Sequence, residues 1–372
     1  MSEPIRVLQV GMSTYFGGTE SFIMNQYRNI DKNRVQFDFL NVYSEPIACQ
    51  EEILKLGGHI YNLNMSRKKG LIKYHKNLKK FFINYSNEFD VIHCNFQSLI
   101  NIDLILYAKR YNIPVRIAHA HNSGYGKEPS WYQKLIIFIN RLRINKYSTD
   151  LFSCSDLAGQ WMFHKNSTVI NNAIDAEKFD FDETNRKQCR EKNQVLSDEK
   201  LFLFVGRLDP QKNPIFLLEI FSEILKIWHN SKLWIVGEGI LKSSMIKKVE
   251  ELSIKDNVVF LGNRSDVNIL MQASDFFILP SKFEGLGIVL IEAQAAGLMS
   301  YTSKDVVPNS VKISDYLNFI SLNSTAEMWA KKITENDYID HKSTLGIIRK
   351  SGFDTFENSK KLQKIYIERV KK

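Results

Sequence analysis

Cysteine is scarce in this chain, and long hydrophobic runs are missing from it. Four cysteines occur among 372 residues, and none belongs to a C-x-x-C pair. This scarcity argues against a disulfide framework and a zinc site, and it favours a reducing compartment. No run of eighteen apolar residues occurs, and no basic segment followed by an apolar core opens the chain. We therefore expect a cytoplasmic protein without a membrane-spanning helix or a signal peptide.

The composition is that of a folded, basic protein. Hydrophobic residues make up 44% of the chain and charged residues 24%, which excludes disorder and fibrous repeats. A chain of 372 residues exceeds one ordinary core and suits two α/β domains. The net charge of +9 favours an anionic partner, which on charge alone could be nucleic acid, an acidic membrane face or a phosphorylated ligand.

Short apolar runs alternate with amphipathic segments twice along the chain, which is the order of two parallel-sheet α/β domains. The strands predicted in the first half are Ile5–Val10, Phe37–Val42, Asp90–Cys94 and Val115–His119. Those predicted in the second half are Leu201–Val205, Lys232–Val236, Val258–Leu261 and Asp275–Leu279. Because Asp175–Ser197 is polar, we place the boundary there, with one domain at 1–175 and the other at 176–354.

A glycine-rich loop follows the first predicted strand and leads into a predicted helix. It contains Gly17 and Gly18, just before a helical segment that starts near Ser21. Glycines let a ligand approach the backbone, and a helix N-terminus directs amides and a positive dipole at an anion. The loop can hold a phosphate, but its spacing also fits a tight turn without any ligand.

Two cations follow the first strand of the second half. Gly206 ends that strand, and Arg207 and Lys212 come directly after it. The carboxyl edge of a parallel sheet is where ligands bind in doubly wound folds. Arg207 can grip a phosphate with two hydrogen bonds and Lys212 can add a point charge, although both could also be surface cations near a turn.

Two carboxylates lie eight residues apart where a predicted strand gives way to a helix. Glu284 stands at the mouth of a glycine loop, and Glu292 lies more than two helical turns further on, at most about 12 Å away. Carboxylates accept hydrogen bonds from sugar hydroxyls, and amides near Gly285 and Gly287 can hold a phosphate between them. Glu292 could also be only a solvent-facing residue of its helix.

Taken together, these motifs resemble family 4 of the retaining glycosyltransferases, which has the GT-B fold and occurs in bacterial capsule and exopolysaccharide clusters. The similarity runs over nearly the whole chain. Its carriers are Gly17–Glu20, His119–Asn122, Asn171–Asp175, Gly206–Asn213, Val236–Gly239, Phe260–Val267 and the pair Glu284 and Glu292. The resemblance implies two Rossmann-like domains that face each other across a deep cleft, with a C-terminal helix at 355–372 packing back on the first domain.

The resemblance also implies roles for these residues. Arg207 and Lys212 would stabilise the leaving nucleoside diphosphate, Glu284 would hold hydroxyls of the donor sugar, and Glu292 would bind the ribose. Val236, Gly237, Glu238 and Gly239 would lie by the base and ribose, and Gly17 and Gly18 would face the diphosphate or the acceptor. The donor-binding set that it implies is completed by Gly206, Gly285, Leu286, Gly287, His119 and Asn122.

One histidine is also implied to meet the donor. His119 and His121 end a predicted strand and project to the same side. We favour His121, which is nearer the strand end, and expect a structural role for His119. The implied reaction retains configuration, uses a nucleotide sugar, most commonly a UDP-sugar, and needs no metal or other cofactor.

Positive charge gathers on two segments of the first half. Residues 65–85 form a basic amphipathic stretch whose cations are Arg67, Lys68, Lys69, Lys73, Lys76, Lys79 and Lys80. A second stretch, Trp131–Tyr147, mixes aromatic and basic residues. Such helices can lie on an acidic bilayer, within reach of a lipid-linked glycan acceptor at the inner face of the cell membrane. Alternatively, their apolar faces pack on the sheet. No nucleic-acid-binding motif accompanies the charge, so we expect no such partner.

Two other functions remain open from the sequence. A sugar-nucleotide epimerase could use the same fold and ligands, and the fold could also persist as a non-catalytic partner of another transferase. Loss of Arg207, Lys212 or Glu284 would point to that partner, and all three are present.

Overall fold

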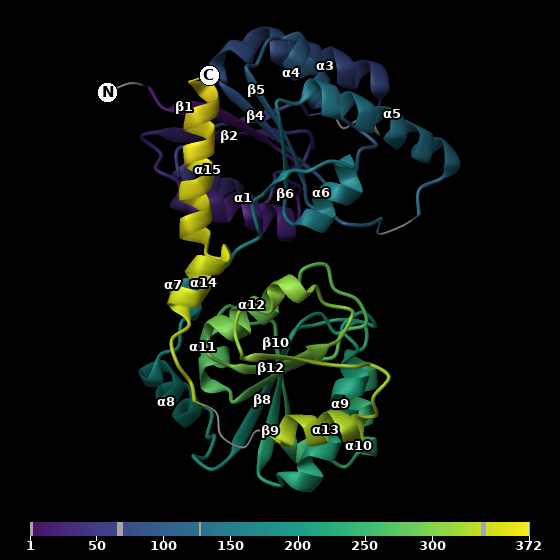
Figure 1. Ribbon diagram of the computed structural model, residues 1–372, viewed down its shortest axis with the longest axis vertical. Coiled ribbons are helices and arrows are strands. Elements are labelled where there is room, and N and C mark those ends of the chain that lie inside the picture. Colours follow the sequence, from purple (N-terminus) through teal and green to yellow (C-terminus); the bar gives the residue numbers. More distant parts are fainter. Residues whose placement is uncertain (1–2, 65–69, 126–127, 336–339, 372) are drawn as a thin grey trace. The chain divides into compact units, whose positions relative to one another are not determined.

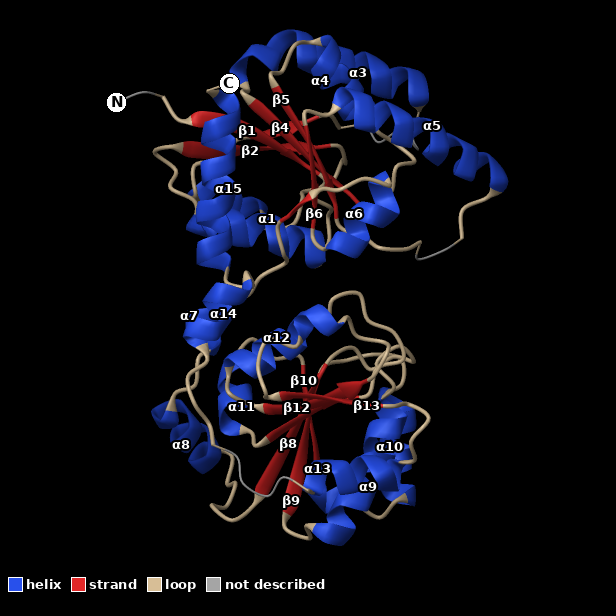
Figure 2. Ribbon diagram, viewed as in Figure 1, coloured by secondary structure: helices blue, strands red, loops and turns tan. Residues whose placement is uncertain are grey.

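The structure is a computed structural model that describes residues 3–64, 70–125, 128–335 and 340–371. The chain divides into two compact units. Unit 1 comprises Met1–Ala173 and Thr355–Lys372, and unit 2 comprises Ile174–Asp354. Each unit is a parallel sheet covered by helices (Figures 1 and 2). The prediction of two parallel-sheet α/β domains is confirmed.

Unit 1 has one sheet with the strand order β3-β2-β1-β4-β5-β6-β7, and every neighbouring pair is parallel. Its strands are β1 (Ile5–Val10), β2 (Val35–Asn41), β3 (Ile60–Asn62), β4 (Val91–Phe96), β5 (Val115–Ala120), β6 (Asp150–Ser153) and β7 (Thr168–Val169). Its helices are α1 (Gly18–Asn29), α2 (Gln50–Lys55), α3 (Leu71–Tyr85), α4 (Asp103–Arg110), α5 (Trp131–Tyr147), α6 (Asp156–Phe163) and α15 (Thr355–Val370).

The inner strands of unit 1 bury side chains on both sides because helices cover both faces of the sheet. In β1, Val7 belongs to a buried cluster that α1 and α15 complete, and Leu8 belongs to one on the opposite face that α3 and α4 complete. Alternate residues of a strand point to opposite faces, so each strand contributes to both layers. Because neighbouring strands are parallel, the carboxyl ends of all these strands lie at one edge of the sheet.

The C-terminal helix α15 is part of unit 1, as the resemblance implies. Leu362 and Tyr366 are fully buried in the cluster shared with α1, and the Ser359 hydroxyl donates to the Gln26 side chain across 2.9 Å. Figure 1 shows this helix, in yellow, lying against α1. The ring of Phe356, near the start of this helix, is exposed and lies beneath the Lys360 ammonium.

Unit 2 has one sheet with the strand order β10-β9-β8-β11-β12-β13, again wholly parallel. Its strands are β8 (Lys200–Val205), β9 (Ser231–Val236), β10 (Val258–Gly262), β11 (Phe276–Leu279), β12 (Met299–Ser303) and β13 (Leu317–Ile320). Its helices are α7 (Ala176–Phe179), α8 (Glu183–Lys192), α9 (Pro214–Ile227), α10 (Lys242–Glu251), α11 (Val267–Ala273), α12 (Ile288–Ala295), α13 (Ala326–Thr334) and α14 (Leu345–Ser351).

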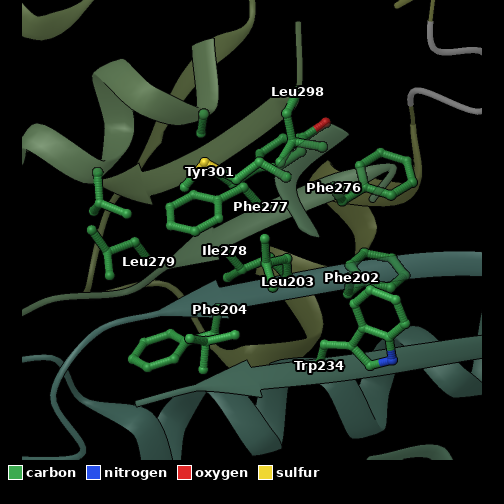
Figure 3. Packing of buried hydrophobic residues seen from close by; sticks show 14 of the residues in the cluster. Phe202, Leu203, Phe204, Trp234, Phe276, Phe277, Ile278, Leu279, Leu298 and Tyr301 are labelled. Carbon is green, nitrogen blue, oxygen red and sulfur yellow. The ribbon is translucent and has the colours of Figure 1, made fainter. Parts of the chain in front are cut away.

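Aromatic side chains dominate the core of unit 2. Phe202 of β8 stacks on Phe276 of β11 with ring centroids 4.9 Å apart, and Tyr301 of β12 continues this layer (Figure 3). The central strand β8 is almost continuously apolar, as expected for a strand buried on both faces. This rigid centre fixes the loops that leave β8, β9 and β11.

The polar boundary segment is helical and is attached to unit 2. Arg186 and Arg190 of α8 both form ion pairs with Asp275, whose carboxylate also accepts from the Leu201 amide. Burial alone would raise the pKa of Asp275, but hydrogen bonding from His341 and the two guanidinium charges bring it well below its ordinary value. The charged residues of this segment therefore hold α8 against the start of β8.

No helix among the described residues is both long and apolar enough to cross a membrane.

Candidate functional site

In unit 1 the predicted glycine loop is held by a carboxylate. Glu20, in the first turn of α1, accepts from the Ser13 amide at 2.8 Å and from the Gly17 amide at 3.0 Å. Glu20 is buried, whereas Gly17 and Gly18 at the start of α1 are exposed. A buried carboxylate thus fixes the loop and leaves its glycines at the surface.

His119 and His121 occupy different environments at the end of β5. His119 is fully buried, with its ring 5.2 Å from that of His93 and 4.8 Å from that of Phe22. His121 is only partly buried, and its Nε2 lies 2.8 Å from the Asn95 side-chain oxygen. The complete burial of His119 suits the expected structural role, and its place among the donor-binding residues stays a prediction.

Burial keeps these histidines neutral. It lowers the pKa of His121 and of His93 to about 3, with the charge of His121 as a second cause for His93. Burial also lowers the pKa of His119 well below its ordinary value, and the charges of His121 and His93 act in the same direction. At neutral pH each ring therefore has one N–H donor and one nitrogen acceptor.

Asn122 lies beside a pocket of unit 1 at the same sheet edge. Its side chain is exposed and donates to the Gln97 carbonyl. Gln97 and Asn122 help to line this pocket, of about 630 Å³, which extends to Tyr132 at the start of α5. The pocket is polar enough to hold hydroxyl groups near His121.

In unit 2 the structure brings Lys212 and Glu284 into contact. The Lys212 ammonium lies 2.6 Å from the Glu284 carboxylate, which also accepts from the Ser281 hydroxyl at 2.6 Å. The two loops are joined further at Gln211, whose carbonyl accepts from the Lys282 amide and whose side chain donates to the Phe283 carbonyl. The loops after β8 and β11 thus form one charged, hydrogen-bonded patch.

Arg207 belongs to this patch but is much more exposed. Its guanidinium donates to Gln211 at 3.3 Å and lies 3.4 Å from the Asp209 carboxylate, and 73% of its side chain is exposed. Because the guanidinium of Arg207 is exposed, it is available to bind an anionic ligand.

The loop after β9 packs closely on the loop after β8. The Gly206 amide donates to the Val236 carbonyl, and the Leu208 amide donates to the Glu238 carbonyl. Gly237 has φ +130°, and an added Cβ would lie 2.0 Å from the Gly206 carbonyl oxygen. An added Cβ at Gly239 would similarly meet the Leu208 carbonyl at 2.4 Å, so both positions require glycine.

Glu292 lies on α12. The residue before this helix, Gly287, has a left-handed backbone conformation with φ +73°. The Glu292 carboxylate is partly buried, and burial raises its pKa to about 7, with Lys178 opposing the shift. Gly285 is exposed and Leu286 is half-buried in the loop before this helix. Glu292 is therefore not the freely solvated residue of the alternative interpretation.

The two basic helices differ in what they bury. On α3 the apolar residues Tyr74, Leu78, Phe81 and Phe82 are buried, so the packing alternative holds for that face. The exposed lysines of α3 are Lys73, Lys76, Lys79 and Lys80, whereas Arg67, Lys68 and Lys69 lie outside the described residues. On α5 only Ile137, Asn140 and Ile144 are buried.

Most apolar residues of α5 are therefore exposed. They are Trp131, Tyr132, Leu135, Ile136, Phe138, Ile139 and Leu142. Neither α3 nor α5 contains an acidic residue. Seven exposed apolar side chains on one helix are consistent with an interaction surface.

The sequence analysis assigned no role to three residues of these sites: Glu20, Asn95 and Ser281. Glu20 carried a signal, because it stands three residues after Gly17, and its carboxylate accepts from the Gly17 amide as the acidic residue of a capping box does. Asn95 carried none, because only the folded chain brings it near His121, whereas Ser281 stands three residues before Glu284 and its contact is local. Among the described residues, no group of three or more His, Cys, Asp or Glu could hold a metal ion.

Comparisons with known proteins agree with this arrangement. The glycosyl transferases group 1 family matches residues 185–336. The glycosyltransferase named EpsF of Bacillus subtilis (strain 168) is 28% identical, over 97% of this chain and 96% of its own. The capsular polysaccharide biosynthesis glycosyltransferase CapH of Staphylococcus aureus is 24% identical, over 98% of this chain and 99% of its own.

Solved structures share the fold of the whole chain. The crystal structure of a glycosyltransferase from Rickettsia africae has a TM-score of 0.78 at 17% identity and covers 100% of both chains. That of Anabaena Alr3699/HepE in complex with UDP has a TM-score of 0.76 at 16% identity and covers 98% of this chain and 100% of the other. The chain thus has the GT-B fold, matches the glycosyl transferases group 1 family over residues 185–336 of unit 2, and is similar over nearly its whole length to glycosyltransferases.

Proposed function

We propose that this protein transfers a sugar from a nucleotide diphosphate sugar, with UDP as the first carrier to test, to a glycan acceptor in polysaccharide biosynthesis. The reaction retains the configuration of the sugar and needs no metal. The observation that supports it most is the patch in unit 2 where Arg207, Lys212 and Glu284 meet. Two cations and a carboxylate side by side suit a ligand that has a diphosphate next to a polyol.

In this proposal the cations act on the leaving group. Negative charge grows on the departing diphosphate, and Lys212 and Arg207 offset it from fixed positions. Glu284 is oriented by Lys212 and Ser281, so that its carboxylate can accept from hydroxyls of the donor sugar. The departing phosphate oxygen takes the acceptor proton on the face where the bond breaks, so no protein base is required.

The nucleoside is held by the loop after β9 and by α12. Gly237 and Gly239 allow close approach to the backbone, which suits a base and ribose lying against Val236–Gly239. Glu292 accepts from the ribose hydroxyls, which are ordinary hydrogen-bond donors for a carboxylate. In unit 1 the exposed amides after Gly17 and the acceptor nitrogen of His121 contribute to donor and acceptor binding.

The acceptor is a lipid-linked glycan in this proposal. One relative, from Escherichia coli, is 26% identical over 81% of this chain, and its name gives GlcNAc-diphosphoundecaprenol as the acceptor. The exposed apolar side of α5 and the exposed lysines of α3 suit contact with an acidic membrane face. The pocket that runs from Asn122 to Tyr132 ends at α5, where such an acceptor would arrive.

A panel of nucleotide sugars tests the transferase proposal. With EDTA present, one UDP-sugar should raise the melting temperature and be slowly hydrolysed, and the released or transferred sugar should keep its anomeric configuration by NMR. Unchanged melting with every donor would discredit the proposal. Binding of a donor without hydrolysis or transfer to any acceptor would favour the non-catalytic partner instead.

A further inference from the structure

Buried polar side chains of β1, β4, β5 and α15 form a continuous hydrogen-bonded chain inside unit 1. At one end, His121 Nε2 lies 2.8 Å from Asn95 Oδ1. Asn95 Nδ2 lies 2.9 Å from the Val10 carbonyl and 3.2 Å from Gln9 Oε1. Gln9 Nε2 lies 3.3 Å from the Tyr366 hydroxyl. These contacts connect the C-terminal helix to the histidine at the sheet edge.

The direction of each hydrogen bond follows from one backbone carbonyl. The Val10 oxygen can only accept, so the Asn95 amide nitrogen must face it. Asn95 Oδ1 therefore faces His121 and can itself only accept, which requires the proton of His121 to be on Nε2. Because His121 is neutral, its Nδ1 then has a lone pair and no proton.

The other branch is directed in the same way. Asn95 Nδ2 donates to Gln9 Oε1, so Gln9 Nε2 donates to Tyr366. The Tyr366 hydroxyl lies 2.6 Å from His93 Nδ1, and His93 Nε2 lies 3.0 Å from His119 Nδ1. A hydrogen bond between two ring nitrogens needs a proton on only one of them, so the two rings cannot both be fully protonated, which agrees with their lowered pKa values.

We propose that Asn95 is a positioning residue, which holds His121 in its Nε2–H tautomer and so presents Nδ1 as an acceptor for a hydroxyl of the sugar ligand. The ligand class rests on the proposed function, but the tautomer does not. His121 Nδ1 is buried and has no hydrogen-bond partner among the residues that the structure describes. A buried acceptor without a hydrogen bond destabilises the structure, and a ligand hydroxyl that donates to it would remove this cost.

The tautomer can be read directly by ¹⁵N and ¹³C NMR of the full-length protein, without any donor. Signals are assigned by comparison with the His121→Gln variant. In the wild type, His121 should show a protonated Nε2 and an unprotonated Nδ1 between pH 6 and 8. Asn95→Ala should give a mixture of both tautomers, and Asn95→Asp should keep the Nε2–H form while it raises the pKa of His121.

Two variants serve as controls. Tyr366→Phe removes the hydroxyl at the far end of the chain and should alter the signals of His93 but not the tautomer of His121. Asn41 is another buried asparagine of the same sheet, and its side chain donates to the Glu45 carbonyl and to the Asn62 side chain. Asn41→Asp therefore introduces a carboxylate elsewhere in the sheet and should leave the tautomer of His121 unchanged. An Nδ1–H tautomer in the wild type, or an unchanged one in Asn95→Ala, would overturn the proposal.

Turnover then tests the ligand contact. With the UDP-sugar that the panel identifies, Asn95→Ala should lower kcat/KM about 3- to 10-fold, the effect of one ordinary hydrogen bond, and Asn95→Asp should restore part of it and shift the pH profile. If Asn95→Ala loses the tautomer without any change in kcat/KM, the sugar contact is wrong. If no donor turns over while the tautomer is as expected, the transferase proposal fails and the positioning role stands.

Discussion

Arg207 and Lys212 differ in burial although both are proposed to act on the same diphosphate. The Lys212 side chain is 15% exposed and its partner Glu284 is 5% exposed, whereas Arg207 is largely exposed. Removing Lys212 would leave a buried carboxylate without its cation, which is costly. Removing Arg207 takes away a largely exposed cation, and its partner Asp209, which is 18% exposed, keeps the hydrogen bond from the Lys212 amide. The two substitutions should therefore separate catalysis from stability.

For Arg207→Ala we expect the transfer rate to fall about 100-fold while the melting temperature stays unchanged, because an exposed ion pair contributes little to stability. Initial rates and calorimetry measure the two effects. Arg264→Ala is the matched control, since Arg264 is a surface arginine of the same unit paired with Asp266. A comparable loss of rate in both variants would show that the effect is not specific to the patch.

For Lys212→Ala we expect a similar loss of rate. We also expect a loss of stability on the order of 3 kcal/mol, because the buried Glu284 carboxylate would keep its hydrogen bond from Ser281 but lose its cation. Chemical denaturation measures the stability. The double variant Lys212→Ala with Glu284→Gln should recover stability without recovering activity. Full stability in the single variant would contradict the pairing.

Glu292 should oppose stability at high pH. Its pKa of about 7 in the folded protein is above the value of about 4.3 in an unfolded chain. The folded state therefore binds more protons than the unfolded state between these values, and stability falls as the pH rises through them. Glu292→Gln should melt higher than the wild type at pH 8 and equally at pH 4.

The same substitution should weaken UDP binding about 10-fold or more, since a neutral amide replaces a charged acceptor. Isothermal titration with UDP measures this affinity. Glu327→Gln, an exposed glutamate of α13, should change neither property. A destabilised Glu292→Gln variant at pH 8 would show that the carboxylate is not held against an unfavourable environment.

At the scale of single residues, local spacing predicted those parts of the sites that lie close together in sequence. Arg207 and Lys212 both lie in the loop that follows β8. Glu284 and Gly287 both lie in the loop that follows β11. Asn95 and His121 come from different strands, and Tyr366 comes from the other end of the chain. The hydrogen bonds that join them depend on the strand order of the sheet, which the sequence alone did not reveal.

Among the elements, long strands with covered faces were predictable and short ones were not. Strands β1 and β5 have six residues each and are mostly apolar, and their predicted bounds are correct to within a residue. Strands β3 and β7 have three and two residues and lie at the edges of their sheet, and β12 contains Ser300 and Thr302. Polar or very short segments carry too little apolar periodicity to be recognised.

Helices α3 and α5 show why an amphipathic pattern does not reveal which face is covered. Both mix apolar and basic residues, but α3 buries its apolar face in the sheet and α5 leaves most of its apolar residues exposed. On α5, Trp131, Phe138 and Leu142 are 79%, 56% and 59% exposed. If the protein contacts a membrane, α5 should supply the apolar contact and α3 the charge.

Flotation with vesicles that contain anionic phosphatidylglycerol tests this division. The double variant Phe138→Glu with Leu142→Glu should abolish binding at every salt concentration, because it removes apolar side chains that would insert into the bilayer. Reversal of Lys73, Lys76, Lys79 and Lys80 to Glu should weaken binding mainly at low salt, where surface charge is least screened. Met328→Glu, an exposed apolar residue of α13, is the control. Equal binding by all variants would exclude this surface.

At the scale of the whole molecule, each unit has its own core and its own set of buried ionisable groups. Unit 1 contains the neutral histidines His93, His119 and His121, all with lowered pKa values. Unit 2 contains Asp275, whose pKa is well below its ordinary value, and Glu292, whose pKa is raised. The two units should therefore respond differently to mild acid.

Between pH 7 and pH 5, unit 1 should lose stability and unit 2 should not. The unfolded chain protonates its histidines near pH 6.5 while the folded rings stay neutral, so the unfolded state binds more protons and stability falls as pH falls. Each histidine contributes roughly 2 kcal/mol at most by pH 5. In unit 2, Asp275 remains charged over this range and Glu292 becomes protonated, which favours the folded state.

Hydrogen exchange, corrected for intrinsic rates, should show faster opening of β1, β4 and β5 at pH 5 and no acceleration in β8, β9 and β11. Equal acceleration in both units would mean that the buried histidines do not control the acid response.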